Sequence, residues 1–111
     1  MNAVTLPTIL LVGIAPDLLP MCQAAATAAR AFMEATDVAN AATMAARCRP
    51  LVIVVDEDLY EFDPAEFDAL ARDVRGKIVT LPTGGVLASD LETMFVAAAQ
   101  QAREGRGAFE G

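Results

Sequence analysis

The chain has 111 residues, 55% of them hydrophobic and 21% charged, which fits one compact domain with an apolar core and excludes disorder over most of its length. Eight basic and fifteen acidic residues give a net charge of -7, so we expect no direct binding to nucleic acid or to a membrane surface. The absence of histidine excludes catalytic triads and zinc sites built on imidazole.

The strands are predicted first, in chain order, from short runs of β-branched and aliphatic residues. Three strong runs cover residues 8–12, 51–55 and 77–81, and a weaker one covers 31–36. The strong runs do not alternate between apolar and polar residues, which is typical of strands buried on both faces of a parallel sheet.

Four helices are predicted between and after these strands. Asp17 precedes a helix over residues 18–29, and Asp37 is the expected cap of a helix over 38–47. Asp63-Pro64-Ala65-Glu66 is the third helix start, and Gly76 the expected end of that helix. Ser89-Asp90-Leu91-Glu92 predicts a capping box for the last helix.

Strands that alternate with helices over short connections predict an α/β fold with a doubly wound parallel sheet in three layers. We expect one domain over residues 1–104 and a flexible tail over 105–111, which is rich in glycine. In such sheets a functional site lies at the carboxyl ends of the strands.

The two cysteines, Cys22 and Cys48, form neither a CxxC motif nor a disulfide framework. We interpret them as thiols in a reducing compartment and expect a cytoplasmic protein, because no basic segment precedes the first apolar run and that run is too short to span a membrane. The sequence has no fingerprint for a flavin, cobalamin or nucleotide, so we expect no cofactor.

The order of these elements resembles a family, the receiver domains of bacterial response regulators, which share the CheY-like and flavodoxin-like architecture. Residues 9–12 followed by 15–19 resemble the first strand and helix start of a receiver, and residues 51–56 resemble its third strand, which ends in the phosphate-accepting aspartate, here Asp56. The resemblance covers residues 8–82. It implies a sheet shortened to about four strands in the order 2-1-3-4, with one helix-strand unit missing before the last helix.

The chain departs from the receiver pattern where that pattern binds metal. Receivers end their first strand with two acids that hold magnesium, and here those positions are Gly13 and Ile14, which offer no side-chain oxygen. Lys77 begins the fourth strand, so the family's phosphate-contacting lysine is also missing. We therefore expect no metal site and no catalytic residue.

Thr80 admits two alignments with the family. It matches either the switch hydroxyl after the fourth receiver strand or the threonine of the Thr-Lys-Pro that ends the fifth, and its interval from Asp56 favours the first. Gly84-Gly85 is interpreted as a turn, because no Lys-Ser follows it.

Asp56 itself has two interpretations, a phosphoacceptor or an inactive strand-end carboxylate. The acid-rich stretch of residues 56–73 is interpreted as a solvated surface, with a bound cation or a basic partner as the alternative.

Loss of an edge strand would expose the strand over residues 77–81, and unprotected edges attract other strands. We therefore expect a homodimer through this strand and the last helix. The candidate interface residues are Ile78, Val79, Leu81, Met94, Phe95 and Ala98.

The functional hypothesis is a non-catalytic pseudo-receiver. It would act as a phosphorylation-independent interaction or dimerisation module in bacterial signal transduction or transcription regulation, docking in trans on a larger regulatory or signalling protein. The alternatives are a genuine phosphoacceptor receiver that uses Asp56, and a flavodoxin-like domain that binds a small ligand.

Overall fold

The computed structural model describes residues 6–110, the side chains of residues 105–110 excepted. The elements in chain order are β1 (Thr8–Val12), the 3-10 turn η1 (Pro16–Leu18), α1 (Leu19–Ala28), β2 (Phe32–Thr36), α2 (Ala41–Cys48), β3 (Val52–Asp56), α3 (Glu57–Phe62), α4 (Pro64–Val74), β4 (Lys77–Leu81) and α5 (Ala88–Glu110). The beginning of the predicted domain, residues 1–5, and the last residue of the predicted tail, residue 111, lie outside the described part.

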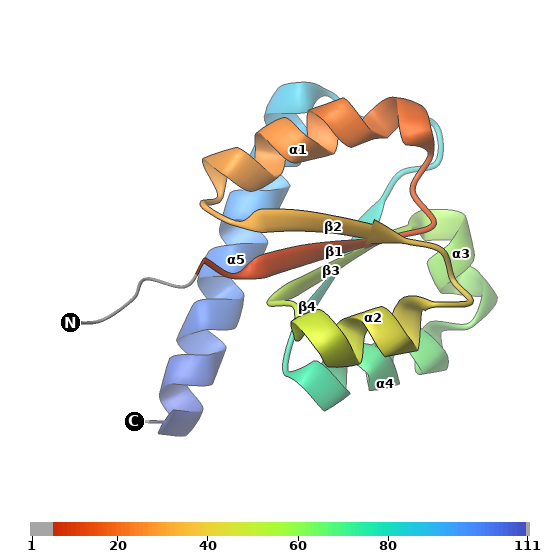
Figure 1. Ribbon diagram of the computed structural model, residues 1–111. Helices are drawn as coiled ribbons and strands as arrows, with labels where there is room; N and C mark the ends of the chain where they lie inside the picture. Colours follow the sequence, from red (N-terminus) through yellow and green to blue (C-terminus); the bar gives the residue numbers. More distant parts are fainter. Residues whose placement is uncertain (1–5, 111) are drawn as a thin grey trace.

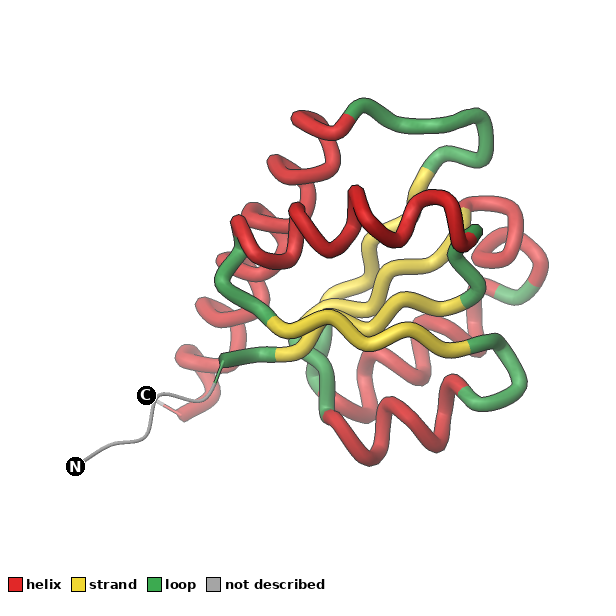
Figure 2. Tube along the Cα trace, turned by 45° about the horizontal axis from the view of Figure 1, so that its top comes forward, coloured by secondary structure: helices red, strands yellow, loops and turns green. Residues whose placement is uncertain are grey.

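The four strands form one parallel sheet in the order β2-β1-β3-β4. Helices α1 and α5 cover one face, and α2 and α4 cover the other (Figures 1 and 2). The predicted α/β class, the parallel doubly wound sheet and the shortened strand order are confirmed. Each pair of consecutive strands is connected through at least one helix, as parallel strands require. Helix α5 follows the last strand and connects to no further strand.

The core consists of two layers separated by the sheet. On the central strand β1, Ile9 and Leu11 pack toward α1 and α5, whereas Leu10 and Val12 pack toward α2 and α4. Side chains of a strand alternate between faces, so an unbroken apolar run fills both layers at once. This is the physical reason why the strong runs predicted the strands.

The helix starts differ from the predictions in three places. Asp37 caps a turn rather than α2: its Oδ1 accepts hydrogen bonds from the backbone N–H of Asn40, at 2.9 Å, and from the Asn40 amide, at 2.8 Å, and α2 begins only at Ala41. Asp17, expected at the cap or in the first turn of a helix, lies in the first turn of η1, which leads directly into α1, and its side chain caps neither element. Because α5 begins at Ala88, Ser89 lies in its first turn rather than at its cap.

Helix α4 begins and ends close to where the sequence predicted. The Asp63 carboxylate accepts from the Glu66 N–H at 3.3 Å, as expected for a cap. At the other end the left-handed residue is Arg75, with φ +57. Gly76 is needed for space instead, because a Cβ there would lie 2.9 Å from the carbonyl oxygen of Pro50.

The last helix continues to Glu110, so residues 105–110 extend α5 where the sequence analysis placed a tail; the flexibility of that segment stays a prediction. Within residues 6–110, no helix is both long enough and apolar enough to cross a membrane.

Candidate functional site

Asp56 lies at the carboxyl end of β3 and is half-buried. Its Oδ1 accepts a hydrogen bond from the backbone N–H of Asp58, at 2.9 Å, and thereby caps α3. The same oxygen accepts the hydroxyl of Thr83, at 3.2 Å, from the loop between β4 and α5. One oxygen of the Asp56 carboxylate therefore accepts hydrogen bonds both from the start of α3 and from the loop between β4 and α5.

Hydrocarbon surrounds the end of β1, where receivers carry their acids. Gly13 has φ +65 and donates its N–H to the carbonyl of Thr36, at 2.9 Å. A Cβ at Gly13 would overlap the Cδ1 methyl of Leu59, which reaches across from α3. Ile14 is half-buried and packs against the α1 and α5 side of the core. Neither position offers a side-chain oxygen to a hard cation, which prefers oxygen ligands.

Helix α3 was not predicted, and it creates this arrangement. Its six residues follow β3 without a connection, because Asp56 both ends the strand and caps the helix. The acidic residues at its start, Glu57 and Asp58, suit the positive end of a helix, a role that the acid-rich pattern of the sequence does not itself indicate. The helix places the Leu59 side chain against Gly13, whereas its carboxylates, Glu57, Asp58 and Glu61, are exposed to solvent.

Thr80 does not contact Asp56 through any described hydrogen bond. It pairs in register with Val55, and Leu81 is the residue opposite Asp56. A hydroxyl that reaches the Asp56 carboxylate must therefore come from beyond the end of β4, and Thr83 supplies it. The sequence offered one signal for this residue, its place directly before the Gly84-Gly85 turn.

Lys77 begins β4 and pairs with Val52, at the amino end of the sheet. Asp56 lies at the opposite end of the neighbouring strand, four residues further on, which corresponds to roughly 13 Å at the usual rise per residue. Lys77 therefore cannot take the place of the phosphate-contacting lysine implied by the resemblance.

Exposed carboxylates gather outside this site, on α3. Glu57, Asp58 and Glu61 bring carboxylate oxygens within 4.8 Å of one another, a spacing at which they could hold a cation. Beside them the Tyr60 hydroxyl donates to Asp68 at 2.7 Å, and this hydrogen bond raises the pKa of Tyr60. The ring of Tyr60 also lies 6.2 Å, centroid to centroid, from that of Phe67.

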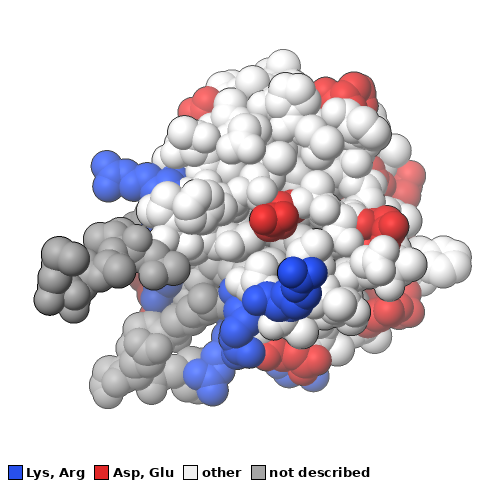
Figure 3. Space-filling model, viewed as in Figure 1, with Lys and Arg blue, Asp and Glu red and all other residues white. Residues whose placement is uncertain are grey.

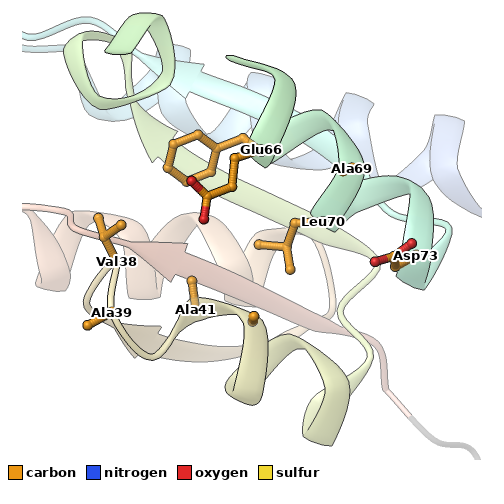
Figure 4. A pocket seen from close by; sticks show the side chains of 9 residues that line it. Val38, Ala39, Ala41, Glu66, Ala69, Leu70 and Asp73 are labelled. Carbon is orange, nitrogen blue, oxygen red and sulfur yellow. The ribbon is translucent and has the colours of Figure 1, made fainter. Parts of the chain in front are cut away.

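A groove lies between α2 and α4 (Figure 4), and a larger but more open hollow, of about 740 Å³, lies along the outer side of α5 beside Thr93 and Val96. The groove measures about 270 Å³ and is lined mostly by small and aliphatic side chains, including Val38, Ala41 and Leu70, with the carboxylates of Glu66 and Asp73 on its α4 side. Pockets for drug-sized ligands usually measure about 300–1,000 Å³, so this groove is small for the ligand-binding alternative.

The predicted interface residues divide into two groups. Leu81, Phe95 and Ala98 are buried within one chain, with 1%, 0% and 4% of their surface exposed. They belong to the core of one chain and offer little surface to a partner, so their place in an interface stays a prediction. Their burial follows from α5 lying across β4 and β3. Ile78, Val79 and Met94 are only partly buried, and α5 also exposes Val96.

Comparison of the chain with protein-family models, with curated proteins and with solved structures gave no match. The resemblance to receiver domains therefore remains an interpretation of the residues and of the shortened four-stranded sheet.

Proposed function

We propose that the chain is a non-catalytic pseudo-receiver, a receiver-like domain that binds other proteins without accepting phosphate. The packing of Leu59 against Gly13 carries this proposal, because it puts hydrocarbon where a receiver would hold magnesium. Phosphoryl transfer to a carboxylate needs a cation to offset the charge of the phosphate oxygens. Asp56 is in addition engaged by the Asp58 N–H and the Thr83 hydroxyl.

In this proposal the module works in the cytoplasm, in bacterial signal transduction or transcription regulation. It docks in trans on a larger regulatory or signalling protein rather than on nucleic acid. A reducing compartment suits its two free thiols, of which Cys22 is buried.

The phosphoacceptor alternative is favoured by one observation, the half-exposed position of Asp56 at the carboxyl end of β3. Incubation with acetyl phosphate and magnesium chloride, followed by intact-mass measurement, separates the two functions. We expect no phosphoryl adduct on the native chain. A robust adduct that disappears in Asp56→Asn would replace the pseudo-receiver proposal with the alternative.

Self-association through β4 is part of the proposal. Among the described strands β4 pairs with β3 alone, and the protection of this edge is limited to Lys77 at the start of the strand and Pro82 directly after it. The half-buried Ile78 and Val79 gain burial if a second copy covers this edge. The proposed interface also includes the exposed Val96, because it lies on α5, the helix that packs against β4.

Light scattering coupled to size-exclusion chromatography, at low micromolar concentration and high salt, tests this step. We expect twice the mass of one chain, and a monomer for Val96→Lys. The matched control is Val38→Lys, since Val38 is similarly exposed, at 43% against 40%, but follows β2 at the other edge of the sheet. A native monomer would refute the dimer without bearing on the phosphorylation result.

A further inference from the structure

Acidic and basic side chains are separated between the two ends of the sheet. The basic residues lie where the strands begin: Arg30, Arg49 and Arg75 follow the ends of α1, α2 and α4, and Lys77 begins β4. The carboxylates concentrate at the opposite end, on and around α3. Figure 3 shows basic side chains at the left and in the lower middle of this face, with a few acidic side chains above and below them and more acidic side chains along the right.

The fold explains why this separation adds up over the whole molecule. Each crossover helix runs antiparallel to the parallel strands, so all helix carboxyl ends point to the amino end of the sheet (Figure 1). A cation at a helix carboxyl end and an anion at an amino end are each stabilised by the helix dipole. Helix α4 shows both preferences, with Glu66 in its first turn and Arg72 in its last, and α2 shows one of them, with Arg47 in its last turn.

The basic end has a repeated backbone feature. Arg30, Arg49 and Arg75 all have left-handed φ values, +58, +45 and +57, at the turn between a helix and the next strand. Glycine adopts this conformation with less strain than any other residue. At all three turns the chain instead places a long cationic side chain, exposed in each case, on the same end of the molecule.

Each end also exposes an aromatic ring. Phe62, at the end of α3 beside the carboxylates of Glu57, Asp58 and Glu61, is 90% exposed, and Phe32, two residues after Arg30, is 59% exposed. Exposed aromatic side chains next to charge are typical anchors of protein interfaces. The two ends of one chain thus carry opposite charges, and each exposes one phenylalanine ring.

We infer that the basic end of one copy docks on the acidic end of the next, so that the chain associates head to tail. The partner is a second copy because the chemistry that fits the basic end, clustered carboxylates beside a phenyl ring, is present on this same chain. Because the two surfaces lie at opposite ends of the sheet, the contact is heterologous and extends into open chains. Lys77 is the only residue of β4 that belongs to these surfaces, and Asp56 does not belong to them, so this contact stands apart from the proposed function.

Charge attraction of this kind depends on ionic strength. The Debye length falls from about 30 Å at 0.01 M salt to about 3 Å at 1 M, so attraction between exposed charges fades across that range. We expect the weight-average mass from sedimentation equilibrium to rise with protein concentration at low salt. At high salt it returns to the mass of a monomer or of the β4 dimer.

Charge reversal identifies the two surfaces. One variant carries Arg30→Glu with Arg49→Glu, and the other carries Glu57→Lys with Glu61→Lys. In the first variant the acidic end stays native, and in the second the basic end stays native, so a mixture retains one native contact between the two variants. At low salt, neither variant alone is expected to form head-to-tail chains. The mixture is expected to form a complex that contains the two variants in equal amounts. Arg30→Lys with Arg49→Lys is the matched control and is expected to extend like the native chain.

Circular dichroism checks that each variant folds. Where a charge reversal unfolds the chain, it is replaced by a neutral pair, Arg30→Gln with Arg49→Gln or Glu57→Gln with Glu61→Gln. Each neutral pair is expected to lower the weight-average mass at low salt. A native mass that does not change with salt would overturn the inference, as would a mixture that behaves as the sum of its parts. Formation of the β4 dimer at high salt is measured separately, so neither proposal depends on the other.

Discussion

The Leu59 side chain occupies the space that a Cβ on Gly13 would take. This contact joins the end of β1 to the short helix that follows β3. Two features favour glycine at position 13, the left-handed φ of +65 and the overlap with the Leu59 methyl group, which any larger side chain would have to displace. An acid at the end of β1 therefore requires Leu59 to move.

Gly13→Asp, which returns one receiver acid, should destabilise the fold. Left-handed strain costs about 1 kcal/mol for a residue other than glycine, and displacing the Leu59 methyl group, the end of a flexible side chain, adds about 1 kcal/mol, at the low end of overpacking costs, so we expect a loss of roughly 2 kcal/mol in urea unfolding. Leu59→Ala in the same chain should recover the overpacking part. Gly84→Asp is the matched control, since open space surrounds Gly84; an equal loss there would contradict the packing argument.

The Thr83 hydroxyl and the Asp56 carboxylate should be energetically coupled. Asp56→Ala removes both the α3 cap and the acceptor for Thr83, at a cost of about 1–2 kcal/mol. Thr83→Val alone should cost about 0.5–1 kcal/mol but close to nothing in the Asp56→Ala background. Asp56→Asn, which keeps an oxygen acceptor, serves as the control. Additive losses in the double variant would show that the 3.2 Å contact contributes nothing in solution.

The strands could be predicted from the sequence because their signal is local. Residues 8–12 and 77–81 form strands with the predicted bounds, since an unbroken aliphatic run has few other ways to be buried. Helix starts were less certain, because an aspartate such as Asp37 caps a turn with the same hydrogen bonds that it would give a helix.

The site depended on contacts that no local pattern encodes. Asp56 and Thr83 are 27 residues apart, and Leu59 meets Gly13 only because a short helix follows β3 directly. The burial of Leu81, Phe95 and Ala98 likewise follows from the placement of α5 across β4. Apolar residues on an expected edge were predicted to face a partner, whereas the chain's own last helix covers them.

Removal of the Asp68 carboxylate should lower the pKa of Tyr60. The Tyr60 hydroxyl donates to that carboxylate, which holds the proton and keeps the pKa above its ordinary value. The chain has one tyrosine and no tryptophan, so an ultraviolet titration reports Tyr60 alone. We expect a lower midpoint for Asp68→Ala and an unchanged one for Asp73→Ala on the same helix. Equal midpoints in all three chains would mean that the hydrogen bond is absent in solution.

The buried Cys22 should make stability fall at alkaline pH. Burial raises the pKa of its thiol from 9.0 to about 11, because the thiolate is poorly solvated among apolar side chains. Below pH 9 both the folded and the unfolded chain keep the proton. Between pH 9 and 11 only the unfolded chain releases it, so stability is lost as pH rises through this window, by at most about 3 kcal/mol.

Urea unfolding of the native chain and of Cys22→Ala, across that pH window, measures this effect. The variant starts from a lower stability because a buried side chain is shortened, so the comparison concerns the slope with pH and not the absolute value. We expect a shallower slope in Cys22→Ala, since the remaining alkaline dependence comes from other groups such as Cys48 and Tyr60, whose pKa values are also raised. Identical slopes would place the Cys22 thiol in contact with water and contradict its burial between the sheet and α1.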